Sequence, residues 1–313
     1  MSQEAFETSR LLRENIERVV LGKPDVVQML VVSLLAGEHV LLEDVPGVGK
    51  TLAAKALAHS IQGSFARLQF TPDLLPSDIT GSMIYRSDTA EFEFSPGPIF
   101  SNVVLADEIN RAPPRTQSAL LEAMSEGKVS IDGVTHHLPE PFIVIGTQNP
   151  FEYEGTYSLP ESQLDRFLLR ASIGYPDRAI EQQVLLTHRQ GEPVDKLPAV
   201  VTVEAIRDVQ AAVREVTFDP SLVDYLLDIV DSTRAHEGFQ VGVSTRGALS
   251  FYRSCQARAI SESRDYVTPD DVKLLAVATL SHRVLPEGIF QGANRDAVET
   301  QMADLLKQIP VPI

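Results

Sequence analysis

The first two thirds of the chain alternate short apolar runs with helical stretches, and this alternation restricts the possible fold more than any other feature. Short, continuously apolar runs are typical of parallel strands that are covered on both faces. Helical segments such as 52–61 and 114–126 separate most of the runs. The pattern predicts an α/β domain in which helices cover both faces of a five-stranded, mostly parallel sheet. The five expected strands are 39–43, 65–70, 102–106, 142–146 and 167–173.

The character of the sequence changes near residues 190–198, where turn-forming residues cluster. Beyond this linker, strand signals nearly vanish and amphipathic helices are expected. Thr268, followed by Pro269, has the pattern of a helix N-cap. A chain of 313 residues therefore divides into a core over 1–190 and a smaller all-helical domain over 199–313. The helices expected in the second domain are 205–216, 221–234, 245–260 and 269–280.

Charge and composition exclude several classes of protein. The 27 basic and 43 acidic residues give a net charge of −16, which opposes non-specific binding to nucleic acid or to an anionic membrane. A single cysteine, Cys255, excludes an internal disulfide framework and suits a reducing compartment. The most apolar stretch, 26–36, is about half of the roughly 20 residues that a membrane span needs. With an acidic start and no targeting segment visible, a cytoplasmic protein is expected.

The clearest motif follows the first expected strand. Residues 44–51, Asp-Val-Pro-Gly-Val-Gly-Lys-Thr, connect that strand to a helix, as a phosphate-binding P-loop does. Backbone N–H groups of the loop and of the helix N-terminus can cradle phosphates. Lys50 would reach the β- and γ-phosphates of a nucleotide, and the Thr51 hydroxyl would hold Mg²⁺.

Asp44 is a departure from the full P-loop pattern, which has its first glycine at this position. The substitution puts the loop geometry in question. Pro46, Gly47 and Gly49 still supply the tight turn, so nucleotide binding is expected to survive.

Polar residues end two further expected strands. Asp107 and Glu108 follow a buried run and so lie at the carboxyl edge of the sheet, where ligands bind in open α/β folds. Asp107 is the natural Mg²⁺ anchor, and Glu108 is the candidate to orient or deprotonate the attacking water. If the strand at 142–146 lies beside them, Asn149 or Thr147 could reach the γ-phosphate or that water. Asn149-Pro150 is also ordinary turn chemistry.

Two arginines are candidates for phosphate contacts. Arg166 precedes the fifth expected strand, and an arginine acting from a neighbouring subunit can raise the rate by about 10³ to 10⁵. Arg246 lies in the first turn of a helix, which is unfavourable for a cation and hints at an anionic partner. Arg111 and Arg115 are weaker alternatives to Arg166. The alternative for each of these arginines is an ordinary surface charge with no phosphate contact.

These segments, in this order and with a helical second domain, resemble the AAA+ ATPases, and among them the MoxR family. The resemblance covers nearly the whole chain. It is most specific in Gln69-Phe-Thr-Pro-Asp-Leu-Leu-Pro-Ser-Asp-Ile-Thr-Gly81, in the run 106–124 that begins Ala-Asp-Glu-Ile-Asn-Arg-Ala-Pro-Pro-Arg, and in Gly-Thr-Gln-Asn-Pro at 146–150.

The resemblance implies an αβα core with a helical lid and ATP lying between them. It implies that residues 46–52 (Pro46, Gly47, Val48, Gly49, Lys50, Thr51 and Leu52) and the stretch Val20, Leu21 and Gly22 bind the nucleotide, the latter at adenine. Asp107 and Glu108 then take the Walker B roles and Asn149 that of the polar sensor. Arg166 is the implied arginine finger and Arg246 the implied second sensor on the lid.

Two inserts fit this family. Residues 71–100 are much longer than an ordinary strand-to-helix connection and resemble a helix-2 insert, unless they are disordered. Residues 128–138 carry Asp132-Gly133 between alternating residues, which is a strong hairpin signal. In the resemblance, both inserts face the pore of a ring.

The resemblance further implies a homo-hexameric, Mg²⁺-dependent ATPase that remodels, matures or loads metal into client proteins, with a von Willebrand factor A-domain protein as partner. Alternatives remain a nucleotide-binding scaffold that hydrolyses little, a magnesium-chelatase-like subunit, and a nucleic-acid motor. The net charge opposes the motor, and the presence of both Glu108 and Arg166 opposes the scaffold.

Overall fold

The computed structural model describes residues 3–149, 155–187, 189, 191–287 and 295–312, so Pro150 and Gln190 of the segments above lie outside the described residues. Its main sheet contains the five expected strands: β1 (Val40–Glu43), β2 (Phe65–Gln69), β5 (Val103–Asp107), β8 (Ile143–Gln148) and β9 (Leu169–Ala171). Their order is β2-β5-β8-β1-β9, and each neighbouring pair is parallel. The predicted parallel sheet is confirmed.

Alternate strand residues face two different apolar clusters, which accounts for the continuously apolar runs. Leu42, Val103 and Ile145 face a cluster with helices α1 (Gln3–Glu17), α2 (Pro24–Ala36) and α3 (Lys50–Ser60). Leu41 and Val104 face the opposite cluster, together with α5 (Pro114–Glu126). Successive strand side chains point to opposite faces, so a sheet covered on both sides needs apolar residues at every position. The core is therefore a three-layer αβα structure.

The second part of the chain is mainly helical. Helices α8 (Val203–Val213), α9 (Pro220–Ala235), α10 (Thr245–Ser261) and α11 (Pro269–Leu280) correspond to the four expected helices. Helix α12 (Arg295–Gln308) was not predicted, and neither was a short antiparallel pair, β10 (Phe239–Val241) with β11 (Leu285–Pro286). The hydroxyl of Thr268 and the carboxylate of Asp271 form the capping box that starts α11.

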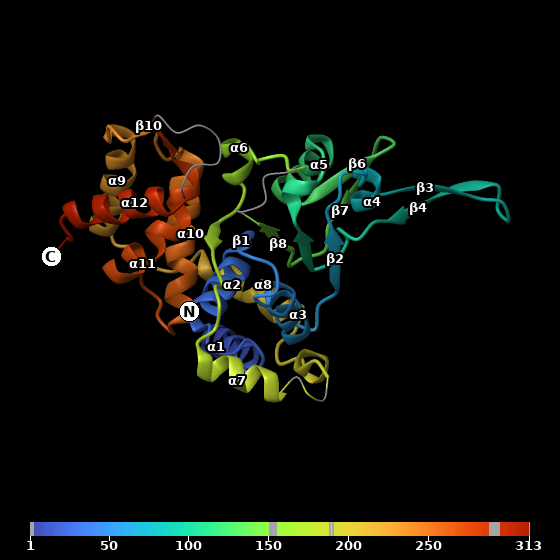
Figure 1. Cartoon of the computed structure of the whole chain (residues 1–313), viewed down its shortest axis with the longest axis horizontal. Coiled ribbons are helices and arrows are strands. Elements are labelled where there is room, and N and C mark those ends of the chain that lie inside the picture. The colour runs from blue at the N-terminus through green and yellow to red at the C-terminus, as the bar shows by residue number, and fades with distance from the viewer. Residues whose placement is uncertain (1–2, 150–154, 188, 190, 288–294, 313) are drawn as a thin grey trace.

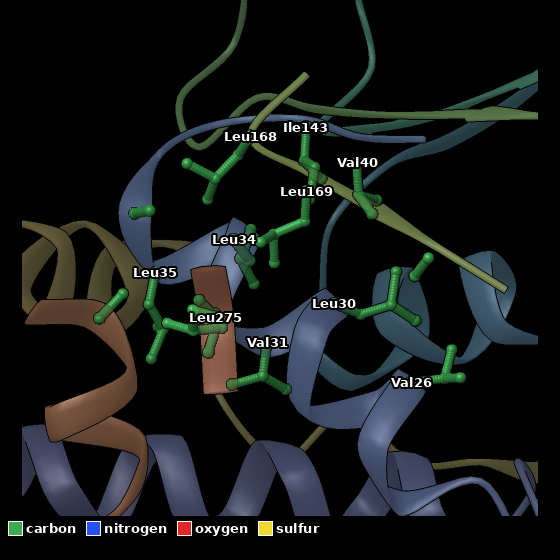
Figure 2. Close-up of a cluster of buried hydrophobic side chains, with 14 of the residues drawn as sticks. Val26, Leu30, Val31, Leu34, Leu35, Val40, Ile143, Leu168, Leu169 and Leu275 are labelled. Carbon is green, nitrogen blue, oxygen red and sulfur yellow. The ribbon is translucent and has the colours of Figure 1, made fainter. Parts of the chain in front are cut away.

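Helix α2 is buried between the sheet and the lid helices. Figure 2 shows Leu30, Leu34 and other α2 side chains packed with Val40 and Leu169 of the sheet and with Leu275 of α11. Helix α2 also packs against α1, α8 and α10. This position explains the most apolar stretch of the sequence, since a helix that is apolar all round must be covered all round. Among the described residues, no helix is both long and apolar enough to span a bilayer.

Both predicted inserts form β-hairpins. After the short helix α4 (Pro76–Thr80), strands β3 (Gly81–Arg86) and β4 (Glu91–Pro96) pair antiparallel and extend away from the body of the molecule (Figure 1). Strands β6 (Lys128–Ile131) and β7 (Val134–His137) form the second hairpin, whose turn residues Asp132 and Gly133 both have positive φ. The His136 ring stacks on Phe94 with 4.0 Å between centroids, so the two inserts are in contact.

The remaining elements connect these parts. They are the 3-10 turns at Ile109–Arg111, Pro193–Lys196 and Ser281–Arg283 (η1, η3 and η4), and the helices α6 (Glu161–Leu164) and α7 (Arg178–Thr187).

Replacing Leu30 by alanine tests the structural role of α2. Leu30 is fully buried, so the cavity left behind should lower the free energy of unfolding by about 2–5 kcal/mol. Leu185→Ala in α7 is the matched control, because that side chain is 73% exposed and its truncation should change stability by less than about 0.5 kcal/mol. Urea titrations of both variants make the comparison. Equal effects would contradict a central role for α2.

Candidate functional site

The phosphate-binding motif lies at the carboxyl edge of the sheet, between β1 and α3. Gly49 takes the left-handed conformation (φ 99°) immediately before Lys50 starts the helix. Pro46 and Gly47 are exposed at the tip of the loop. Lys50 is buried at its root, where its Nζ donates a hydrogen bond to the Asp44 carbonyl oxygen at 2.8 Å. A glycine-containing loop that leads directly into a helix N-terminus is the arrangement that suits an anion.

The Asp44 side chain anchors this loop to the segment that follows β9, the edge strand beside β1. Its carboxylate accepts hydrogen bonds from the Ser172 hydroxyl at 2.9 Å and the Gly174 N–H at 2.6 Å, just after β9, and from the Val45 N–H at 2.9 Å. Burial alone would raise the pKa of Asp44, but these hydrogen bonds hold it below its ordinary value. A glycine could not make this anchor, so the departure from the P-loop pattern has a structural purpose.

The segment after β9 also contacts the stretch expected to hold adenine. Lys23 donates to the Tyr175 carbonyl oxygen at 2.9 Å. Ile180 of α7 packs against Gly22, where an added Cβ would lie only 2.8 Å from the Ile180 side chain. Val20 is buried and Leu21 is partly buried beside them. The P-loop and the Val20-Leu21-Gly22 stretch are therefore connected through one short segment.

Asp107 and Glu108 are joined to β8 by a single hydroxyl. Thr147 Oγ1 donates to Asp107 Oδ1 at 2.6 Å and accepts from the Glu108 N–H at 2.9 Å. The other oxygen of Asp107 pairs with Arg67 at 2.6 Å. Because β8 lies between β5 and β1, this hydroxyl holds the Asp107 carboxylate and the Glu108 backbone at the β8 side of β5. The sequence allowed either Asn149 or Thr147 to reach the γ-phosphate or the attacking water, and in the structure the Thr147 hydroxyl bonds the Asp107 carboxylate and the Glu108 N–H.

Glu108 has a left-handed backbone conformation, and its carboxylate is bound by two neighbouring side chains. Its φ of 57° lies in the left-handed region, which costs a non-glycine residue about 1–3 kcal/mol and is often found at functional sites. Its carboxylate oxygen Oε2 accepts from Gln69 at 2.9 Å and pairs with Arg111 at 3.0 Å. Arg111 therefore contacts the carboxylate of its own subunit. Gln69 ends β2, and sequence reasoning missed its role although strand ends at this edge were the place to look.

The donor set suits a magnesium ion held jointly with a nucleotide. The Asp107 carboxylate and the Thr51 hydroxyl offer hard oxygen ligands, which Mg²⁺ prefers. Over the part of the chain that the structure describes, no group of three or more His, Cys, Asp or Glu residues could hold a metal alone. Mg²⁺ sites commonly use one or two protein ligands and take the rest from phosphates and water.

A buried ionic cluster beside the P-loop was also missed. Glu43, at the end of β1, is 6% exposed and accepts a hydrogen bond from Gln148. Its carboxylate faces Arg170 of β9 at 3.8 Å and Arg295 of α12 at 3.5 Å. Since Gln148 directly precedes the buried Asn149, the cluster connects the last lid helix to the strand end that carries the predicted sensor.

Arg166 and Arg246 lie together near the amino ends of the sheet strands, opposite the carboxyl ends that carry the P-loop. They line one polar cavity of about 350 Å³, along with Arg253 and His39. His39 precedes β1, and the P-loop follows it, so the length of the strand, about 13 Å for four residues, separates the cavity from Lys50. The Arg166 guanidinium donates to the Leu121 carbonyl oxygen and to Ser125 of α5, each at 2.5 Å. The structure thus does not bring Arg246 to the P-loop of its own chain, and Arg115 is exposed at the start of α5.

Comparison with known proteins agrees with this arrangement. Residues 39–169 match a family model described as "ATPase family associated with various cellular activities (AAA)", and residues 231–303 match an AAA lid domain. The chain is 50% identical to the uncharacterized protein YeaC of Bacillus subtilis, over 96% of this chain and 93% of that protein. It is 40% identical to Chaperone MoxR1 of Mycobacterium tuberculosis, over 91% of this chain and 77% of that protein. The chain belongs to the MoxR family of AAA+ ATPases.

A solved structure extends this agreement to three dimensions. The crystal structure of a candidate ATPase from Cytophaga hutchinsonii matches with a TM-score of 0.88 at 36% identity, over 99% of this chain and 96% of that chain. This MoxR-family chain therefore shares the complete core-and-lid fold of a solved relative, including the placement of the lid against the sheet.

The Asp44 anchor predicts a pH-dependent difference in stability. Asp44→Asn should lower the Tm at neutral pH, because the amide has one acceptor oxygen where the carboxylate has two, so either Val45 or the pair Ser172 and Gly174 loses its acceptor. The folded-state pKa lies below the unfolded value of about 3.9, so the contribution of the carboxylate is complete above about pH 5 and is lost as the pH falls through the folded pKa. The Tm difference between wild type and variant should therefore narrow below about pH 4.

Thermal melts between about pH 3 and 8 measure this difference. Asp88→Asn, at the exposed tip of the β3–β4 hairpin, is the control and should show no such narrowing. A gap for Asp44→Asn that stays constant or widens on acidification would show that the charged carboxylate is not what anchors the loop.

Proposed function

We propose that this MoxR-family chain binds ATP with Mg²⁺ and hydrolyses it in a site completed by a neighbouring subunit. One observation carries the proposal: the P-loop lysine, Lys50, and the Asp107–Glu108 pair share one edge of the sheet, with Thr147 on the intervening strand bonded to both carboxylic residues. Positioning and electrostatic stabilisation account for nearly all of phosphoryl-transfer catalysis. A lysine, a magnesium anchor and a carboxylate on adjacent strand ends supply these elements.

The nucleotide-binding roles follow from position. The backbone of residues 46–52 would cradle the phosphates, with the Lys50 ammonium on the β- and γ-phosphates. The Thr51 hydroxyl and the Asp107 carboxylate would hold Mg²⁺, which neutralises charge developing on the phosphates. The Val20-Leu21-Gly22 stretch would contact adenine, with Ile180 closing the other side of Gly22.

Glu108 would accept the proton of the attacking water or orient that water, and Asn149 would contact the γ-phosphate. Before doing so, the Glu108 carboxylate must leave Gln69 and Arg111, which hold it at 2.9 and 3.0 Å. Hydrolysis would therefore depend on a rearrangement at the end of β2, and this dependence suits an ATPase that is idle until its ring or partner is in place.

The two arginines would serve the next subunit. Arg166 and Arg246 share a cavity at the edge opposite their own P-loop, so neither faces the nucleotide of its own chain. In a closed ring with head-to-tail contacts, one edge of each subunit meets the other edge of its neighbour. We therefore favour Arg166 over Arg111 as the trans-acting arginine, and we infer a homo-hexamer in which Arg246 also acts in trans.

The energy of hydrolysis would remodel protein clients. One relative is named Chaperone MoxR1, and the two contacting hairpins, which include the exposed Tyr85 and Phe92, offer a surface for client segments. The family suggests that the clients are protein complexes that need maturation or metal loading, and that a von Willebrand factor A-domain protein is the partner. We place this function in the cytoplasm. The net charge of −16 opposes nucleic acid as the client.

Glu108→Gln should separate nucleotide binding from turnover. The variant keeps the P-loop and should bind ATP normally, whereas loss of the carboxylate should lower the Mg²⁺-dependent rate by about 10² or more. Lys50→Ala is the companion variant and should lose nucleotide binding itself. Phosphate release and binding of a fluorescent ATP analogue measure the two effects. Turnover retained in Glu108→Gln would remove this residue from its role, and wild-type binding without turnover under all conditions would favour the scaffold.

Mixing two inactive variants should restore activity if the site spans two subunits. Arg166→Ala provides an intact Lys50 and Glu108, while Glu108→Gln provides an intact Arg166. In a randomly mixed ring, about one quarter of the interfaces would combine the intact halves. The ATPase rate of the mixture should exceed that of either variant alone, and the same should hold for Arg246→Ala. Absence of rescue at every mixing ratio would contradict a shared site.

A further inference from the structure

A buried arginine of the lid contacts the segment that carries Arg166. Arg283 lies in the turn η4 after α11, and its side chain is only 1% exposed. Its guanidinium pairs with Asp165 Oδ1 at 2.7 Å and donates to the carbonyl oxygens of Phe167 and Leu168 at 2.8 and 2.9 Å. These acceptors lie on both sides of Arg166 along the chain. One lid side chain therefore holds the backbone from which Arg166 projects.

The same arginine contacts the start of the helix that carries Arg246. The second oxygen of Asp165 accepts from the Ser244 hydroxyl at 3.2 Å, and Ser244 is the N-cap of α10. At Gly247 an added Cβ would lie 2.8 Å from Cδ of Arg283, so the arginine stem passes directly over the first turn of that helix. The cluster of Arg283, Asp165 and Ser244 thus lies between the backbones of Arg166 and Arg246.

Stability alone is a poor explanation for this cluster. Burying a guanidinium and a carboxylate costs desolvation energy that their attraction offsets only with good geometry, and apolar residues of similar volume often stabilise a protein as well. What an arginine adds is direction, because its planar fork binds several acceptors in fixed positions. Here the acceptors are the Asp165 carboxylate and two carbonyl oxygens in one short segment, so the fork fixes the position of that segment relative to the lid.

We propose that Arg283 and Asp165 are positioning residues that hold Arg166 and Arg246 in one fixed arrangement, so that both reach the nucleotide of the neighbouring subunit together. The inference rests on the proposed function, in which these two arginines act in trans. It adds that their placement is set by a lid-to-core ion pair. A change at this ion pair would then displace the backbones of both arginines at once.

Asp165→Asn and Arg283→Lys test the proposal in the full-length protein. Each variant should bind ATP like the wild type, because the cluster lies away from the P-loop. The ATPase rate should fall by about 10²-fold, as expected when catalytic groups are misplaced by about 1 Å. Each variant should regain activity when mixed with Glu108→Gln, which has intact arginines, and should regain none when mixed with Arg166→Ala, which lacks the same donated group.

Arg264→Lys is the matched control. Arg264 makes a comparable pair with Asp271, a buried residue in the first turn of α11, at 2.7 and 2.8 Å, but that pair does not contact the Arg166 segment. The Arg264→Lys substitution should lower the Tm and leave the ATPase rate unchanged. If Arg283→Lys does not fold, Asp165→Asn and Ser244→Ala carry the test.

The outcomes separate this inference from the proposed function. If Arg166→Ala is rescued by Glu108→Gln but Asp165→Asn is not, or if Asp165→Asn is fully active, the positioning role is wrong and the shared site stands. If Arg166→Ala is not rescued either, the shared site itself is wrong, and the positioning role is wrong with it. Complementation of Asp165→Asn by Arg166→Ala would also overturn the inference.

Discussion

The burial of α2 between the sheet and the lid is the constraint on which the rest of the structure depends. This helix has apolar side chains on every side, and neither the sheet nor the lid alone can cover them. Because Leu34 and Leu35 need both partners, the lid cannot pack elsewhere without uncovering a large apolar surface. The orientation of α10, and with it the position of Arg246, follows from this packing.

As a result, the two ends of the parallel strands carry different parts of the proposed site. All strand ends that carry the P-loop, Asp107 and Glu108 meet at the carboxyl edge, since parallel strands share one direction. The arginines collect at the amino edge, where the lid meets the start of β9. A single subunit therefore keeps the two halves of the proposed site apart, and assembly of a ring would bring them together. The clusters around Glu43 and Arg283 then link the lid to both edges.

Much of the fold could be predicted because its signals are local. Several of the five strands were predicted from continuous apolar runs, and the Asp132-Gly133 turn was predicted from its conformational preference. The helix α12 was missed although its buried residues Val298, Met302 and Leu305 follow a helical spacing that the sequence already contains. The contacts of Glu43 and Gln69 were missed because each depends on a partner from a distant part of the chain.

The sequence by itself determined the chemistry that is available to this protein: a P-loop lysine, two carboxylates after a buried strand, and arginines outside it. These features are encoded in short segments whose local structure follows from residue type and spacing. Only the tertiary structure decided which of them meet. The partner of Glu108, the anchoring role of Asp44 and the joint placement of Arg166 and Arg246 all depend on packing between segments far apart in the chain, because burial and direction of a side chain are properties of the assembled core.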